Sequence, residues 1–286
     1  MPQLLSKAEI DKTLAGISIP SRPQILVKLG TELAKEDPDP QVIVRLISVD
    51  VALSAAVLKT VNSPFFGLSN KTSSVASAVA LLGMRSASQI VTTLMLKNSV
   101  VGDVRSLERF WHTSEKLAAI SAYIATTMRR GPRDDAYSFG LFHDIGIPIL
   151  GHKIATYGQT LASVASSPFR SLTSLENEHH ATNHATLGYL VATQWCLPAV
   201  LCEAILYHHD DSIFQDQDAV SPQALNLVAI ARLADHLCDD GISPHSDHEW
   251  DRVGDQVLEH LDLSEGDCLS LRDELANMSR ENSRIA

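Results

Sequence analysis

Helical spacing of apolar residues most constrains the fold of this chain. Apolar side chains recur three and four residues apart almost throughout, and no alternation of apolar and polar residues is long enough to predict a strand. Prolines and short polar joints, such as residues 37–40 (DPDP) and Gly131-Pro132, interrupt the pattern where helices usually begin or end. The sequence therefore predicts an all-α protein.

Length and the position of the histidines suggest two subdomains. The chain has 286 residues, enough for one large domain or two modest ones. Residues 100–106 (VVGDVRS) are the best division, because a run rich in Val, Leu and Met precedes them and most histidines follow. We predict one helical subdomain over residues 1–100 and another over residues 104–286. A chain of this size needs no metal to fold, so any metal site would serve function.

Charge and targeting signals exclude several classes of function. The chain carries 23 Lys and Arg against 34 Asp and Glu, and its net charge of −11 would repel a nucleic acid. The four cysteines show no CxxC spacing and are expected to be reduced core residues. Lys7 and Glu9 precede any apolar run, and no segment approaches the ~20 apolar residues of a membrane span. We expect a cytoplasmic protein that binds neither nucleic acid nor membrane.

Helical phase assigns two candidate functional side chains to apolar faces. A helix over residues 181–194 would place His184 on the same face as Leu187, which predicts a buried imidazole. Asp235 continues the apolar stripe that contains Val228. A carboxylate on such a face is costly unless a cation, a metal or a strong donor meets it. The sequence therefore predicts a partner for Asp235.

The remaining candidates lie near the ends of expected helices. His143-Asp144 and His208-His209 each follow an apolar run, so both members of each pair could lean into one cleft, and His112 lies near the start of another long helix. The alternative is that the histidines donate to backbone carbonyls while the aspartates cap helices or pair with protonated histidines. Seven donors suit one or two transition-metal ions such as Fe, Mn or Zn: His112, His143, Asp144, His184, His208, His209 and Asp235.

The order of these residues resembles the HD superfamily of metal-dependent phosphohydrolases, and the whole chain resembles its HDOD branch, the HD-related output domain. The resemblance covers about residues 19–237. It rests on NSPFFG (62–67), LGMRS (82–86), GLFHDIG (140–146) and the run from HATLGY to the His-His pair (184–209). It implies an all-α fold in which an N-terminal helical bundle packs on an HD-like helical bundle.

The resemblance also implies a role in bacterial signal transduction. HDOD domains are usually output or regulatory modules beside response regulators of two-component systems or cyclic-dinucleotide enzymes, and many are thought to have no enzymatic activity. No receiver, GGDEF-like or EAL-like segment is attached in this sequence. We therefore expect a stand-alone output protein that binds a regulatory protein partner or a small ligand such as a nucleotide, without turnover.

A metal-dependent phosphohydrolase acting on a nucleotide or cyclic dinucleotide is the alternative, with His143 and Asp144 as central ligands. The resemblance matches the seven donors to the ligand positions of HD-GYP phosphodiesterases, but two departures weigh against catalysis. Ile147 stands where those enzymes commonly carry a lysine that meets the substrate phosphate, a contact worth about 1.5–3 kcal/mol. The Gly-Tyr-Pro motif is absent after the His-His pair, where residues 210–222 include four aspartates that would repel an anionic substrate. Lys153, Arg129 or Arg130 could substitute for that lysine, although all three are expected to be solvated surface cations.

Overall fold

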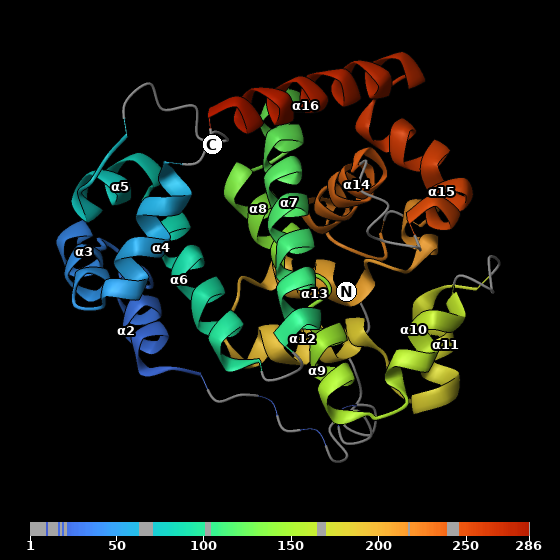
Figure 1. Cartoon of the computed structure of the whole chain (residues 1–286), viewed down its shortest axis with the longest axis horizontal. Helices are drawn as coiled ribbons and strands as arrows, with labels where there is room; N and C mark the ends of the chain where they lie inside the picture. The colour runs from blue at the N-terminus through green and yellow to red at the C-terminus, as the bar shows by residue number, and fades with distance from the viewer. Residues whose placement is uncertain are drawn as a thin grey trace. The chain divides into compact units, whose positions relative to one another are not determined.

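The computed structural model describes residues 10, 17, 19, 22–62, 71–100, 104–164, 170–216, 218–238 and 246–285, and within these residues the regular secondary structure is entirely helical (Figure 1). This confirms the all-α prediction. The described residues separate into two compact units. One unit is drawn from residues 20–100 and 194–196, and the other from residues 1–19, 101–193 and 197–286.

Side-chain caps and prolines begin the helices of the first unit. Asp39, Asp50 and Ser74 each accept a hydrogen bond from a backbone N–H in the first turn of the following helix, and Pro40 occupies the first helical position after Asp39. The predicted joint at residues 37–40 is therefore confirmed as a helix start. The described helices of this unit are α2 (Gln24–Leu33), α3 (Pro40–Ser48), α4 (Val51–Val61), α5 (Val75–Leu82) and α6 (Met84–Ser99).

The second unit contains the remaining described helices and all seven candidate donors. The Gly131-Pro132 joint separates the first two of the helices named below. They are α7 (Val104–Met128), α8 (Arg133–Phe142), α9 (Gly146–Lys153), α10 (Tyr157–Val164), α11 (Leu172–His180), α12 (His184–Gln194), α13 (Ala199–Tyr207), the 3₁₀ turn η2 (Asp211–Phe214), α14 (Pro222–Leu237), α15 (Ser246–Leu261) and α16 (Glu265–Ile285).

Helix α14 lies at the centre of the second unit. It packs against α7, α8, α13 and α15, while α7 packs along α8 (Figure 1). Buried residues occur on every side of α14, as expected for a helix surrounded by others. Its last turns carry Arg232 and Asp235, so the central helix delivers charged groups into the interior.

The structure bears on the cysteines, on membrane-spanning segments and on the NSPFFG block. No disulfide joins any of the four cysteines, of which Cys202 and Cys268 are buried, Cys238 is partly buried and Cys196 is exposed. Within the described residues, no single helix is long and apolar enough to cross a bilayer. Residues 63–67 of the NSPFFG block lie outside the described residues.

Candidate metal centre and pocket

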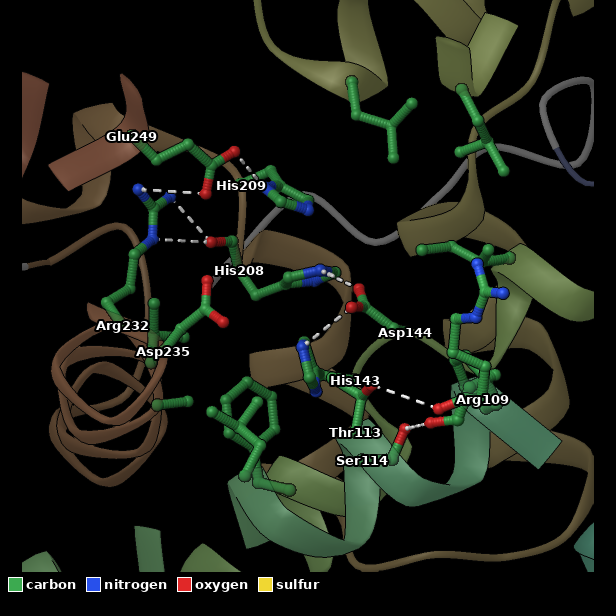
Figure 2. Close-up of a pocket in the computed structure, with 18 residues that line it drawn as sticks. Arg109, Thr113, Ser114, His143, Asp144, His208, His209, Arg232, Asp235 and Glu249 are labelled. Carbon is green, nitrogen blue, oxygen red and sulfur yellow. Dashed lines mark hydrogen bonds and ion pairs between the residues drawn. The ribbon is translucent and has the colours of Figure 1, made fainter. Parts of the chain in front are cut away.

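A pocket of about 300 Å³ opens within the second unit. Figure 2 shows polar side chains from α7, such as Ser114, and from α14, such as Asp235, gathered in this pocket. Apolar residues line the other surfaces, among them Phe110, Ile147, Leu161 and Leu172. The polar lining residues are Arg109, Thr113, Ser114, His143, Asp144, His208, His209, Arg232, Asp235 and Glu249.

A break between two helices places His143 and Asp144 in the same pocket. Helix α8 ends at Phe142 and α9 begins at Gly146, so the chain turns within residues 143–145. Adjacent residues on a continuous helix would diverge by about 100°, whereas here both side chains line the pocket. Gly146 then lies so close to α12 that an added Cβ would be 2.1 Å from the His184 carbonyl oxygen. The glycine therefore allows His184 to approach Asp144.

The Asp144 carboxylate is the centre of the site. Its Oδ1 lies 3.2 Å from Nε2 of His208 and 3.4 Å from Nε2 of His184, and its Oδ2 lies 3.1 Å from Nε2 of His143. One donor atom from each of Asp144, His184, His208 and His209 falls within 4.8 Å of the others. Nitrogen and carboxylate donors grouped in this way could hold a transition-metal ion.

Hydrogen bonds fix which ring nitrogen of each histidine faces the carboxylate. Nδ1 of His143 and Nδ1 of His208 each lie near the carbonyl oxygen three residues earlier, at 3.1 and 2.7 Å. A carbonyl can only accept, so each Nδ1 carries a hydrogen, and Nε2 keeps a lone pair for a metal ion whenever the ring is neutral. Nδ1 of His184 is 2.7 Å from Oε2 of Glu176. Metal-binding histidines are typically oriented by such acceptors, so the donor set fits a divalent metal.

Glu176 is a buried acceptor that the sequence interpretation missed. The residue has an exposed fraction of 0%, and its carboxylate accepts from Nδ1 and the backbone N–H of His184 and from the Tyr157 hydroxyl. Burial favours its neutral form, but attraction to His184 and these hydrogen bonds hold the pKa of Glu176 below its ordinary value. The neighbouring residues are polar, but Glu176 follows the buried Leu172 by four residues, and that spacing was the available signal.

Neighbouring groups set the charges of His184, His208 and Asp144. Burial alone would lower the pKa of His184, but the carboxylates of Glu176 and Asp144 raise it to about 10. Burial and the adjacent His209 lower the pKa of His208 well below its ordinary value. Despite burial, His143 and the surrounding hydrogen bonds keep the pKa of Asp144 well below normal. In the metal-free protein, a proton on His184 therefore takes the place that a metal ion could occupy.

Asp235 lines the pocket without the direct partner that its sequence position suggests. No donor among the described residues lies within hydrogen-bond or ion-pair distance of its carboxylate, and it is not in the four-residue donor group. Burial raises the pKa of Asp235 to about 7, although the charges of His143 and Arg232 oppose the rise. The molecule therefore keeps a costly carboxylate facing its pocket.

Replacing Asp235 by Asn is expected to stabilise the metal-free protein at pH 8 by about 2–4 kcal/mol. The folded pKa of Asp235 is raised above the unfolded value of 3.8, so its contribution to stability is lost as the pH rises through about 7. The advantage of Asp235→Asn should shrink toward pH 4. Urea unfolding of chelator-treated protein between pH 4 and 8 measures this, with the exposed Asp255→Asn as control; equal pH profiles for both variants would contradict it.

The structure does not bring every candidate donor to the pocket. His112 lies on the exposed side of α7 and does not line the cavity, whereas the next two residues, Thr113 and Ser114, do. The seven candidates therefore separate into six that lie at or beside the Asp144 cluster and one that does not.

The arginines that line the pocket are not the cations that the sequence suggested. Lys153, Arg129 and Arg130 are not among the lining residues, whereas Arg109 is. Arg109 has no acidic partner within ion-pair distance among the described residues, unlike Arg232, which pairs with Asp211 at 3.0 Å. Arg109 was missed because nothing in its local sequence distinguishes it from a solvated surface cation.

Comparisons with known proteins find one similar sequence and several solved structures of similar fold. The chain is 26% identical over 199 residues to an uncharacterized protein of Treponema pallidum (strain Nichols), a match that covers 67% of this chain and 38% of that protein. A solved structure from Shewanella amazonensis SB2B, described as a "putative phosphohydrolase", shares the fold with a TM-score of 0.70 at 21% identity, covering 96% of each chain.

A second solved structure is an HDOD domain protein with unknown function from Geobacter sulfurreducens. It gives a TM-score of 0.64 at 22% identity and covers 95% of this chain and 97% of that one. The family model of the HDOD domain matches residues 19–211, well over half of the sequence. With the helical fold and the His-Asp cluster in place, this match shows that the chain belongs to the HDOD domain family.

Proposed function

We propose that this chain is a bacterial signal-transduction output module that acts by binding, without turnover, and that its pocket holds a divalent Fe, Mn or Zn ion. The observation that carries the metal assignment is the Asp144 carboxylate facing Nε2 of both His184 and His208, whose Nδ1 atoms are occupied by acceptors. His209 would complete the donor set, with His143 and Asp235 beside it. A bound ion would supply a Lewis-acidic position for an anionic ligand.

The charges around the pocket support binding over phosphoryl chemistry. Ile147 lines the pocket, so the position that follows Gly146 contributes a neutral side chain. Asp235 and Glu249 add negative charge, while Arg232 is already paired. Phosphoryl transfer needs positive groups where negative charge develops in the transition state. A single cation at the edge of the pocket provides little of that stabilisation. We infer that the output passes to a regulatory protein partner, with a nucleotide as the small ligand to test first.

A metal-dependent phosphohydrolase is the second candidate, and Arg109 is the observation that favours it. Its guanidinium lines the pocket without an acidic partner among the described residues and could meet a substrate phosphate. Assays for turnover of phosphomonoester and phosphodiester substrates with Mn²⁺ or Fe²⁺ distinguish the two functions. Reproducible turnover that Asp144→Ala abolishes in a folded protein would replace the binding function with the hydrolase.

Metal content is the direct test of the centre. Tag-free protein purified anaerobically without chelator is expected to contain a near-stoichiometric transition metal by plasma mass spectrometry. The double substitution Asp144→Ala/Asp235→Ala should remove it, because the variant loses the central carboxylate. Asp255→Ala/Asp273→Ala, at two exposed positions, is the matched control and should retain the metal. A wild-type protein without metal after Fe, Mn and Zn have each been supplied would overturn the metal assignment.

A further inference from the structure

Helix α15 lies beyond the matched family segment yet contributes to the pocket. The HDOD match ends at residue 211, whereas α15 covers Ser246–Leu261. Glu249, in its first turns, lines the cavity beside His209, and its side chain is only 11% exposed (Figure 2). A helix outside the family segment therefore places a buried carboxylate at the candidate metal centre.

Glu249 meets His209, the one histidine of the donor group with no other acceptor among the described residues. Its Oε1 lies 2.7 Å from Nδ1 of His209, an ion-pair distance, and a hydrogen bond would form once the ring turns its N–H toward the carboxylate. With Nδ1 directed at Glu249, Nε2 of His209 is the nitrogen left for a metal ion. The pairing parallels that of Glu176 with His184 on the other side of the cluster.

Arginines tie the same carboxylate to the rest of the site. Arg232, whose side chain is 8% exposed, lies 3.8 Å from Oε2 of Glu249 and 3.0 Å from Oδ1 of Asp211. Its Nε and Nη2 also donate to the carbonyl oxygen of His208, at 3.0 and 2.7 Å. Arg252 of α15 donates to Oδ2 of Asp211 at 3.0 Å. One network of ion pairs and hydrogen bonds between largely buried side chains thus holds α15 in place and fixes the position of the His208-His209 pair.

We propose that α15 is a functional part of the metal centre, in which Glu249 positions His209 as a ligand and metal binding in turn strengthens the attachment of α15. The second half follows from the first, because a coupling between two equilibria acts equally in both directions. The proposal rests on the proposed metal centre. In a signalling module, it would carry the state of the pocket to a helix on which a partner could detect it.

Affinity and coordination test the positioning role of Glu249. Zn²⁺ affinity is measured by competition with a chromophoric chelator, and Co²⁺ serves as a spectroscopic probe of the ligand set. Glu249→Ala is expected to weaken Zn²⁺ binding about 10–100-fold and to change the visible Co²⁺ bands. Glu249→Gln keeps an oxygen that can accept from Nδ1–H, so it should restore the wild-type Co²⁺ bands. Glu259→Ala, at an exposed position of the same helix, should change neither.

Hydrogen exchange tests the reverse direction. Saturating Zn²⁺ is expected to slow amide exchange in residues 249–257 about tenfold or more in the wild-type protein and in Glu259→Ala, but much less in Glu249→Ala. If the wild type binds neither Zn²⁺ nor Co²⁺, both the proposed metal centre and this inference fail. If it binds them but Glu249→Ala leaves affinity, Co²⁺ spectrum and exchange unchanged, the metal centre stands and only the role of α15 is overturned.

Discussion

Replacing Glu176 by Ala is expected to lower the free energy of unfolding of the metal-free protein by about 3–5 kcal/mol. Glu176 is fully buried and accepts from both the ring and the backbone of His184 and from Tyr157. Alanine would leave a buried imidazolium with one of its two carboxylate partners missing and a buried phenol hydroxyl unpaired. The loss of each buried partner carries a desolvation penalty in addition to the lost interaction.

Urea unfolding at pH 6, in the presence of a chelator, measures this loss against two further variants. Glu176→Gln fills the same space and can accept from His184 and donate to the Tyr157 oxygen, so its loss should be markedly smaller. Glu178→Ala lies on the same helix but removes only a surface pair with Arg170, so little change is expected. Equal unfolding midpoints for Glu176→Ala and Glu178→Ala would show that the buried pair contributes nothing.

The effect of Glu176→Ala should also depend on pH. The pKa of His184 is raised from 6.5 to about 10, so its contribution to stability is complete below about pH 6.5 and is lost as the pH rises through 10. The pKa of Glu176 is lowered, so its contribution is complete above 4.5 and is lost as the pH falls. The difference between wild type and Glu176→Ala should therefore be largest between about pH 5 and 6.5 and should narrow toward pH 10.

The helical fold was predictable because its signals are local. Apolar spacing indicated helices, and residues such as Asp39 with Pro40 mark a helix start by satisfying or removing the first free N–H groups. The assignment of residues 194–196 to the unit formed by residues 20–100 was not predictable in this way. It depends on contacts between segments that are distant in sequence, and no local pattern encodes such contacts.

Helical phase predicted part of the site for the same reason. The burial of His184 followed from its position relative to Leu187, and the structure confirms it with an exposed fraction of 0%. His112 could not be placed by phase alone. Helix α7 has buried residues on several sides, among them Leu117, Ala118 and Ala119, so its sequence does not reveal which side meets the pocket. The side of α7 that faces the pocket is the one that carries Thr113 and Ser114.

The partners that orient the histidines were the part that sequence reasoning missed. Glu176 and Glu249 are ordinary glutamates in polar stretches, and each acquires its role by meeting a histidine from another helix. The donor atoms of a metal centre can be suggested by residue type, because few side chains bind metals. The acceptors behind them can be any carboxylate or carbonyl, so only the folded arrangement identifies them.

Gly146→Ala is the second substitution with a large expected effect, a loss of about 3 kcal/mol or more in the free energy of unfolding. The new Cβ would lie 2.1 Å from the His184 carbonyl oxygen and 2.7 Å from its Cα, and both are backbone atoms that cannot rotate away. Either α9 or the start of α12 must move. Because His184 begins α12 and faces Asp144, the same movement should weaken metal binding.

Gly158→Ala provides the matched control for Gly146→Ala, since no atom lies within 4 Å of the Cβ position of this exposed helical glycine. It is expected to leave stability unchanged or to raise it by up to about 1 kcal/mol, because alanine loses less conformational freedom on folding. Chemical unfolding and Zn²⁺ affinity of both variants make the comparison. A Gly146→Ala protein as stable as Gly158→Ala would mean that α9 and α12 do not approach closely, and the Asp144–His184 contact that supports the metal centre would lose its structural basis.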